Sequence, residues 1–228
     1  MPFPMLLAHH VAPARQIRPR APQSLTLYDG ARGTTPDAQG WMFYTTGGHQ
    51  TLAHGGRATL FSTLGDGTYQ GGYLRTVPFP LSRVRGYTLG FDLQVLAETH
   101  AVPNRAGVDL IVIGDDRKGI ELGFWADQIW AQSDKPLFLH AEGVPFTTAA
   151  GLVHYALAFR GPSYSLSADG VRILSGPVRD YTAFHGFPDP YRTPNLLFLG
   201  DDSKSAAGSF RLARFQVSRS RPRGGPAR

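Results

Sequence analysis

The chain has 228 residues, a formal charge of +6, 27 glycines, 18 prolines and no cysteine. Its hydrophobic fraction of 42% is enough for the core of one folded domain, and the lack of cysteine excludes disulfides, zinc–thiolate sites and cysteine nucleophiles. No apolar run approaches the ~18 residues of a membrane helix, so we expect no transmembrane segment.

The positive charge is concentrated at the two ends of the chain. Residues 1–22 contain three arginines, residues 219–228 contain four, and neither segment contains an acidic residue. The body, residues 23–218, is therefore close to neutral, which argues against a nucleic-acid partner. We expect a basic, proline-rich N-terminal arm or tail and a basic C-terminal tail. These are either solvated ends or segments that dock on an anionic surface or a neighbouring subunit.

Apolar and polar residues alternate in short segments along the whole body, which is the pattern of half-buried strands. The segments, in chain order, are 25–28, 41–44, 58–61, 72–75, 87–95, 108–113, 120–126, 129–131, 155–159, 164–168, 171–174, 196–199 and 209–217. Glycine, proline and aspartate separate them and no helical period intervenes. The chain is therefore predicted to be all-β, an antiparallel two-sheet jelly-roll sandwich of about 11–13 strands.

Two local features refine this prediction. Asp169-Gly170 lies between two alternating segments, and both positions of a type I′ hairpin turn need a positive φ. The apolar parity changes between Leu212 and Phe215, so we expect a β-bulge near Ala213-Arg214.

Several motifs resemble a known group of proteins. Residues 152–159 and 164–170 resemble the hairpin "His-x-x-Ala … Tyr-x-Asp-Gly" of laminin-G-like domains, and residues 195–200 and 208–215 resemble the closing strand pair of that group. Over about residues 25–218, the chain therefore resembles the concanavalin A-like lectin/glucanase jelly roll.

A narrower resemblance is to bacterial exported modules called choice-of-anchor domains. The residues that carry it are Leu27–Gly30, Gln39–Trp41, Gly119–Trp125 and Arg179–Tyr181. This resemblance implies an extracellular or cell-surface location. The sequence departs from the pattern in two respects: residues 1–22 do not form an export signal, and residues 219–228 contain no apolar anchor.

Enzymes of the resembled group carry paired catalytic carboxylates on the concave sheet. The nearest candidates here are Glu121 and Asp127, and six residues along one strand would separate them by ~20 Å, too far for glycoside hydrolysis. Asp109, on another strand, is a second possible neighbour of Glu121. We therefore expect no enzymatic activity, and a glycoside hydrolase or lyase is the less favoured alternative.

Sugar recognition needs flat apolar faces together with polar acceptors, and the polar strand faces contain both. The predicted ligand-binding residues are Asp92, Gln94, Asp109, Glu121, Trp125, Asp127 and Trp130. The alternative is an open or loop-covered sheet face on which the tryptophans are simply packed.

Two acidic pairs follow strands: Asp115 with Asp116, and Asp201 with Asp202. Carboxylates in loops suit a hard cation such as Ca²⁺, and the resemblance also favours calcium. Aspartate is equally common in turns without any ion, so turn chemistry is the alternative.

The sequence thus favours a non-catalytic extracellular or cell-surface β-sandwich module that binds a polysaccharide or glycoconjugate on its concave sheet. The alternative is a structural subunit of a filament, sheath or surface layer that self-associates through its tails and sheet edges.

Overall fold

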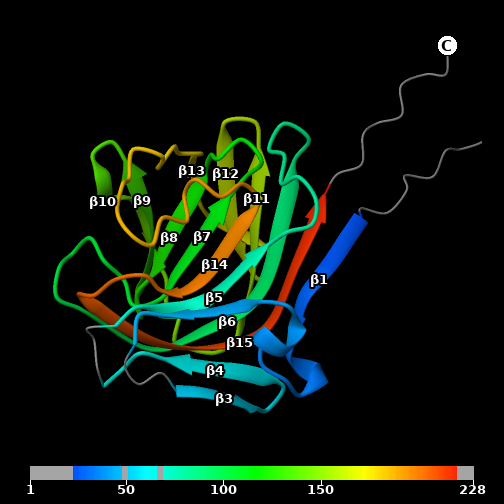
Figure 1. Ribbon diagram of the computed structural model, residues 1–228, viewed down its shortest axis with the longest axis vertical. Coiled ribbons are helices and arrows are strands. Elements are labelled where there is room, and N and C mark those ends of the chain that lie inside the picture. The colour runs from blue at the N-terminus through cyan, green and yellow to red at the C-terminus, as the bar shows by residue number, and fades with distance from the viewer. Residues whose placement is uncertain (1–22, 48–50, 66–68, 220–228) are drawn as a thin grey trace, which may run out of the picture.

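The computed structural model describes residues 23–47, 51–65 and 69–219, which form two antiparallel β-sheets packed face to face (Figure 1). These residues contain no α-helix, only the short 3-10 turns Gly30–Arg32 and Asp37–Gln39. The predicted all-β two-sheet class is confirmed. Both predicted tails, apart from Arg219, lie outside the described residues. None of the described segments is a helix of the length and hydrophobicity that would cross a membrane.

One sheet has eight strands in the order β13-β12-β11-β6-β15-β4-β3, and β1 also pairs with β15. Their bounds are β1 Gln23–Asp29, β3 Thr51–Gly55, β4 Ala58–Ser62, β6 Tyr87–His100, β11 Val153–Arg160, β12 Ser163–Ala168, β13 Val171–Pro177 and β15 Ala206–Arg219. In the pairing of β1 with β15, Gln23 lies opposite Arg219, so the first and last described residues are neighbours.

The other sheet has seven strands in the order β10-β9-β8-β7-β14-β5-β2. Their bounds are β2 Met42–Thr45, β5 Gly71–Thr76, β7 Asp109–Ile113, β8 Gly119–Phe124, β9 Gln128–Asp134, β10 Leu137–Pro145 and β14 Leu196–Asp201.

The main core lies between the sheets and follows the predicted alternation. Leu89, Phe91 and Phe159 from the eight-stranded sheet pack with Leu122 from the seven-stranded sheet, and all four are buried. Phe91 stacks on Phe215 of β15 with ring centroids 5.5 Å apart. Burial of large apolar side chains contributes about 1.5–3 kcal/mol each, so this layer holds the sandwich together.

Both local predictions are confirmed. Asp169 and Gly170 have φ values of 47° and 84° in the turn between β12 and β13. The register of β15 with β6 shifts between Leu212 and Arg214, which is the expected bulge.

The structure contains β3 and β10 in addition to the predicted strands. β10 was missed because its residues are half-buried or exposed on both faces, so its sequence does not alternate. β3 has only five residues and ends in His54-Gly55.

The seven-stranded sheet also has an apolar outer face. Ile111, Ile113, Leu196 and Phe198 form a second, smaller cluster there with two tyrosines from residues 178–195, which we call the covering segment. These tyrosines are Tyr181 and Tyr191. The seven-stranded sheet is therefore buried over much of both faces, and its strands are apolar on both sides.

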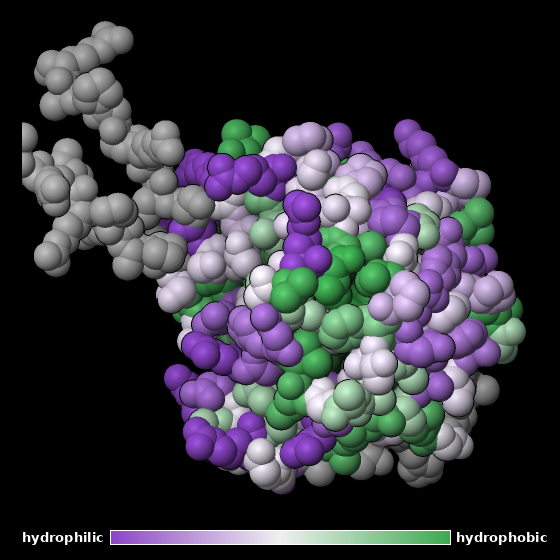
Figure 2. All heavy atoms as spheres, turned by 180° about the vertical axis from the view of Figure 1, so that it is seen from behind, coloured by the Kyte–Doolittle hydropathy of each residue, from purple (hydrophilic) through white to green (hydrophobic). Residues whose placement is uncertain are grey.

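The remaining surface mixes side chains of both kinds. Figure 2 shows one face of the molecule, on which hydrophobic side chains gather in the central area and hydrophilic ones occupy much of the margin. The most exposed large apolar side chains in the described part of the chain include Val84 at 84% and Phe187 at 94%.

Candidate functional site

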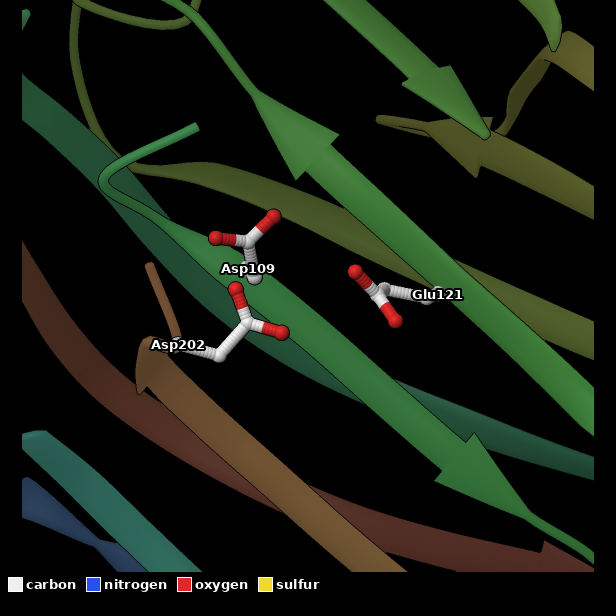
Figure 3. A group of neighbouring side chains, drawn as sticks. All are labelled: Asp109, Glu121 and Asp202. Carbon is white, nitrogen blue, oxygen red and sulfur yellow. The ribbon is translucent and has the colours of Figure 1, made fainter. Parts of the chain in front are cut away.

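Three carboxylates meet on the outer face of the seven-stranded sheet. Asp109 begins β7, Glu121 lies in β8, and Asp202 directly follows β14; the three side chains point toward one another (Figure 3). One oxygen from each lies within 4.8 Å of one oxygen from each of the others.

Strand register explains why these side chains meet. Asp109 lies opposite Gly123 on β8 and opposite Gly200 on β14. Neither glycine has a side chain, so the space around Asp109 is filled by its diagonal neighbours, Glu121 and Asp202.

Burial makes this cluster electrostatically unusual. Asp109 is 0% exposed, Glu121 is 1% exposed, and Asp202 is partly buried. Burial raises the pKa of all three carboxyl groups, and repulsion among them adds to the effect on Asp109 and Glu121. Each carboxyl group therefore favours its neutral, protonated form unless a cation compensates the negative charge.

Few hydrogen bonds satisfy the cluster. Tyr191 of the covering segment donates its hydroxyl to Glu121. Neither oxygen of Asp109 accepts a hydrogen bond from an N–H or hydroxyl group among the described residues, and the Asp202 carboxyl lies within hydrogen-bonding reach of Asp109 and Glu121. Arg105 attracts Glu121 and Asp202 electrostatically and opposes the rise of their pKa values.

The floor next to the carboxylates is aromatic and polar. The Trp130 indole lies over Gly123, where an added Cβ would come within 2.8 Å of the ring. Gln132 lies one register step beyond the pair Leu122–Ala131, which places it beside Glu121. Its Nε2 donates to the carbonyl oxygen of Asn104 at 3.1 Å, and its buried Oε1 has no hydrogen-bond partner within the part of the chain that the structure describes.

A cavity of about 730 Å³ opens over this floor. Glu121, Asp202 and Gln132 line it, whereas Asp109 lies beneath the wall. The other polar lining groups include Gln70, Arg75, Arg105, Asp189, Ser203, Lys204 and Ser205, and the aromatic ones are Tyr44, Phe138, Phe184, Phe187, Tyr191 and Phe198. The cavity therefore offers aromatic faces, acceptors and donors together.

The covering segment forms one wall of the cavity and is anchored to the sheet. Arg179 pairs with Glu142 of β10, and its main chain bridges to Gly119 of β8. Tyr181 donates its hydroxyl to the carbonyl oxygen of Gln132 at 2.7 Å. These contacts hold Tyr191 over Glu121.

The structure divides the predicted ligand-binding residues between the two sheets. Asp92 and Gln94 lie on β6 of the eight-stranded sheet, whereas Asp109 and Glu121 lie on the seven-stranded sheet, so these residues do not form one site. Asp92 accepts from His154 at 2.5 Å, and Gln94 donates to the carbonyl oxygen of Ala149 at 3.0 Å. The sequence shows that a strand has a polar face but not which sheet contains the strand.

The remaining predicted residues lie on or next to β8 and β9 and differ in how far they are exposed. Trp125 stacks on His100 at 4.1 Å and donates to the carbonyl oxygen of Arg105. Trp130 is 0% exposed, so neither of its faces is open to a sugar. Asp127 lies in the exposed turn between β8 and β9, outside the cavity lining.

The two acidic pairs predicted for calcium lie at opposite ends of the sheet. One pair comes after β7 and the other at the end of β14, and these two strands run antiparallel. Asp115 and Asp116 are exposed, and Asp116 pairs with Arg83 at 2.7 Å. Asp201 accepts from Thr63 and from the Ser203 main chain, and burial raises its pKa to about 8. Of the four aspartates, only Asp202 joins other carboxylates.

The sequence suggested Asp109 as a possible neighbour of Glu121 and gave Asp202 as a separate calcium ligand, but it did not bring the three residues together. Gln132 and Tyr191 were not predicted as site residues, since a single glutamine and a tyrosine in a proline-rich loop belong to no recognisable binding motif. One sequence feature does point to the cluster: the residue opposite Asp109 on each neighbouring strand is a glycine, Gly123 or Gly200. This feature can be recognised only when the pairing register of the strands is known.

No family model matches the chain, and no curated protein matches it. Solved structures do match. A carbohydrate esterase from the Shiga toxin-encoding bacteriophage phi24B is 12% identical, with 88% of this chain and all of that chain covered and a TM-score of 0.60. The Crh5 transglycosylase is 14% identical, with 90% of each chain covered and a TM-score of 0.53.

The carbohydrate recognition domain of Emp46p is also similar, at 10% identity, with 84% of this chain and 94% of that chain covered and a TM-score of 0.51. At these identities the likeness concerns the fold. The narrower resemblance to choice-of-anchor domains stays a prediction. The chain has the concanavalin A-like lectin/glucanase β-sandwich fold.

Proposed function

We propose that this protein is a non-catalytic module that binds a glycan in the cavity on the outer face of its seven-stranded sheet. The observation that carries the proposal is the lining of that cavity, which combines aromatic side chains with acidic, basic and amide groups around about 730 Å³. Pyranose rings present an apolar C–H face and several hydroxyls, and such a lining suits both.

Phe187 is the best-placed platform for a sugar ring. It lines the cavity and is 94% exposed, so its ring faces are available. Because the Phe187 ring is not packed in the core, a ligand can stack on it without displacing contacts within the protein.

The similar structures support the same class of ligand. Their names describe a carbohydrate esterase, a transglycosylase and a carbohydrate recognition domain. A carbohydrate ligand also agrees with the extracellular or cell-surface location expected from the sequence.

The test is a titration of the full-length chain with a panel of soluble oligosaccharides and polysaccharides, followed by Phe187→Ala. We expect the best ligand to lose about two- to tenfold in affinity, because stacking on an aromatic ring contributes about 0.5–1.5 kcal/mol. Val84→Ala is the matched control, since Val84 is also an exposed apolar side chain but lies outside the cavity lining. Unchanged affinity in Phe187→Ala, or no binding across the panel, would contradict the proposal.

A second candidate function is cleavage of a glycosidic bond. Glu121 and Asp202 both line the cavity, and their nearest oxygens are within 4.8 Å, close to the ~5–5.5 Å separation of a retaining carboxylate pair. The distance argument against catalysis applied to Glu121 and Asp127, which is a different pair.

Release of reducing ends from the bound polysaccharide decides between the two functions. If wild-type protein releases them and Glu121→Gln does not, the module is an enzyme. If the ligand binds and remains intact over days, the module is a binding protein.

A further inference from the structure

Asp109, Glu121 and Asp202 bring three carboxyl groups together in a mostly buried place. No ion pair involves Asp109, Glu121 or Asp202 among the described residues. Arg105 attracts Glu121 and Asp202, but its Nη1 donates to two carbonyl oxygens, those of Asn104 and Phe138, at 2.6 and 2.9 Å. Buried carboxylates are normally paired, protonated or bound to a metal.

A second feature of the same floor points to a ligand. Gln132 is 1% exposed and lines the cavity beside Glu121, and its Oε1 has no hydrogen-bond partner in residues 23–47, 51–65 and 69–219. Its Nε2 is held by the carbonyl oxygen of Asn104, which fixes the amide so that Oε1 is the free atom. A buried acceptor without a donor costs about 1–3 kcal/mol unless something outside the chain satisfies it.

We propose that Asp109, Glu121, Asp202 and Gln132 bind a calcium ion at the floor of the cavity. All four supply oxygen, the donor that Ca²⁺ prefers, and a mixture of carboxylate and amide oxygens is usual for it. Oxygens on opposite sides of Ca²⁺ lie ~4.6–5.2 Å apart, because each bond is ~2.3–2.6 Å long. The three carboxylate oxygens lie within 4.8 Å of one another, a separation at which one ion can be held between them.

The geometry also indicates which coordination positions of the ion face the cavity. Asp109 lies beneath the cavity wall, whereas Glu121, Asp202 and Gln132 line it. The ion would therefore be held from the sheet side and would present its remaining coordination positions to the cavity. The inference does not depend on the glycan proposal, since every ligand atom that it uses belongs to this chain.

The experiment measures thermal unfolding of the full-length chain, first treated with EDTA and dialysed, in CaCl₂ or MgCl₂. We expect Ca²⁺ at about a hundred times its Kd to raise Tm by about 5–10 °C. Mg²⁺ should raise it less, because Mg²⁺ demands a smaller and more regular octahedral site.

Asp109→Asn and Asp115→Asn form a matched pair of variants. Asp109→Asn should melt no lower than wild type without Ca²⁺, because it removes a buried charge, and should lose the rise in Tm. Asp115→Asn, in an exposed turn, should keep the full rise. No rise in wild type at millimolar CaCl₂, or an equal rise in Asp109→Asn, would overturn the proposal.

Terbium luminescence supplies a readout that does not depend on stability. Tb³⁺ replaces Ca²⁺ in oxygen sites, and Trp130, over the glycine opposite Asp109, is close enough to sensitise it. We expect Tb³⁺ emission on tryptophan excitation, competed by CaCl₂ and lost in Asp202→Asn, whose partly buried side chain tolerates exchange. Emission that persists in Asp202→Asn would contradict the assignment.

Discussion

At the scale of single residues, Gly123 shapes the floor of the site. Its missing Cβ leaves room for the Trp130 indole, which would otherwise be 2.8 Å from it. We expect Gly123→Ala to lower the free energy of unfolding by about 1–3 kcal/mol, because an added methyl group in a filled space forces neighbours to move. Urea denaturation followed by tryptophan fluorescence measures both the loss and the displacement of the ring.

Gly151→Ala is the control for that substitution. An added Cβ at Gly151 meets nothing within 4 Å, and its backbone does not have a positive φ. Its stability should stay within about 0.5 kcal/mol of wild type or rise slightly. Equal losses in the two variants would mean that backbone freedom, and not the contact with Trp130, makes glycine necessary at position 123.

At the scale of elements, the ion pair between Arg179 and Glu142 ties the covering segment to β10. Tyr164 donates its hydroxyl to the same carboxylate at 2.7 Å. Burial opposes the ionised form of Glu142, but the hydrogen bonds from Arg179 and Tyr164 outweigh it, and the pKa of Glu142 is lowered. A carboxyl group with a lowered pKa stabilises the folded state above its unfolded pKa of ~4.3, and that stabilisation is lost as the pH falls through the folded value.

We therefore expect Glu142→Gln to lower the free energy of unfolding by about 1–2 kcal/mol at pH 7, an intermediate loss because the pair is only partly buried. The difference between wild type and variant should shrink at pH 3. Urea denaturation at the two pH values measures it. Asp116→Asn, which removes the more exposed pair with Arg83, should change stability by less than about 1 kcal/mol. A wild-type-to-variant difference that does not change with pH would contradict the assignment.

At the scale of the whole molecule, the two basic tails leave the fold at one place, because Gln23 lies opposite Arg219. Residues 1–22 contain three arginines and residues 220–228 contain three more, and the two segments join the fold at neighbouring residues, Gln23 and Arg219. We expect the full-length chain to bind heparin at low salt and to elute as NaCl rises. A full-length variant with these six arginines replaced by serine should not be retained. Equal retention would place the basic surface on the sandwich itself.

The same two proteins test the prediction of a self-associating structural subunit. If the tails join copies of the chain, size-exclusion chromatography of the full-length protein should show a larger species that the serine variant lacks. A single monomer peak for both would leave glycan binding as the function to pursue.

The fold could be predicted from the sequence because alternation is a local property. Phe91 and Leu122 are apolar at positions whose neighbours are polar or small, and the structure buries both between the sheets. β10 escaped prediction because no such contrast exists along it.

The site could be predicted only in part, because it depends on register and on sheet membership. Asp109 and Glu121 were named, but their proximity depends on the pairing of β7 with β8. Asp92 has the same local pattern as Asp109 and lies on the opposite sheet. Tyr191 reaches Glu121 across 70 residues of sequence, a distance over which no motif operates.

The meeting of β1 with β15 has a consequence for how the chain could be rewired. A short peptide from Arg219 to Gln23 would close the fold into a ring, since these residues are already strand partners. The exposed Asp169-Gly170 turn is then a natural place to open it, as loop tips tolerate new ends well. Such a circular permutant would keep the carboxylate cluster intact while moving both free ends of the polypeptide away from the β1–β15 edge.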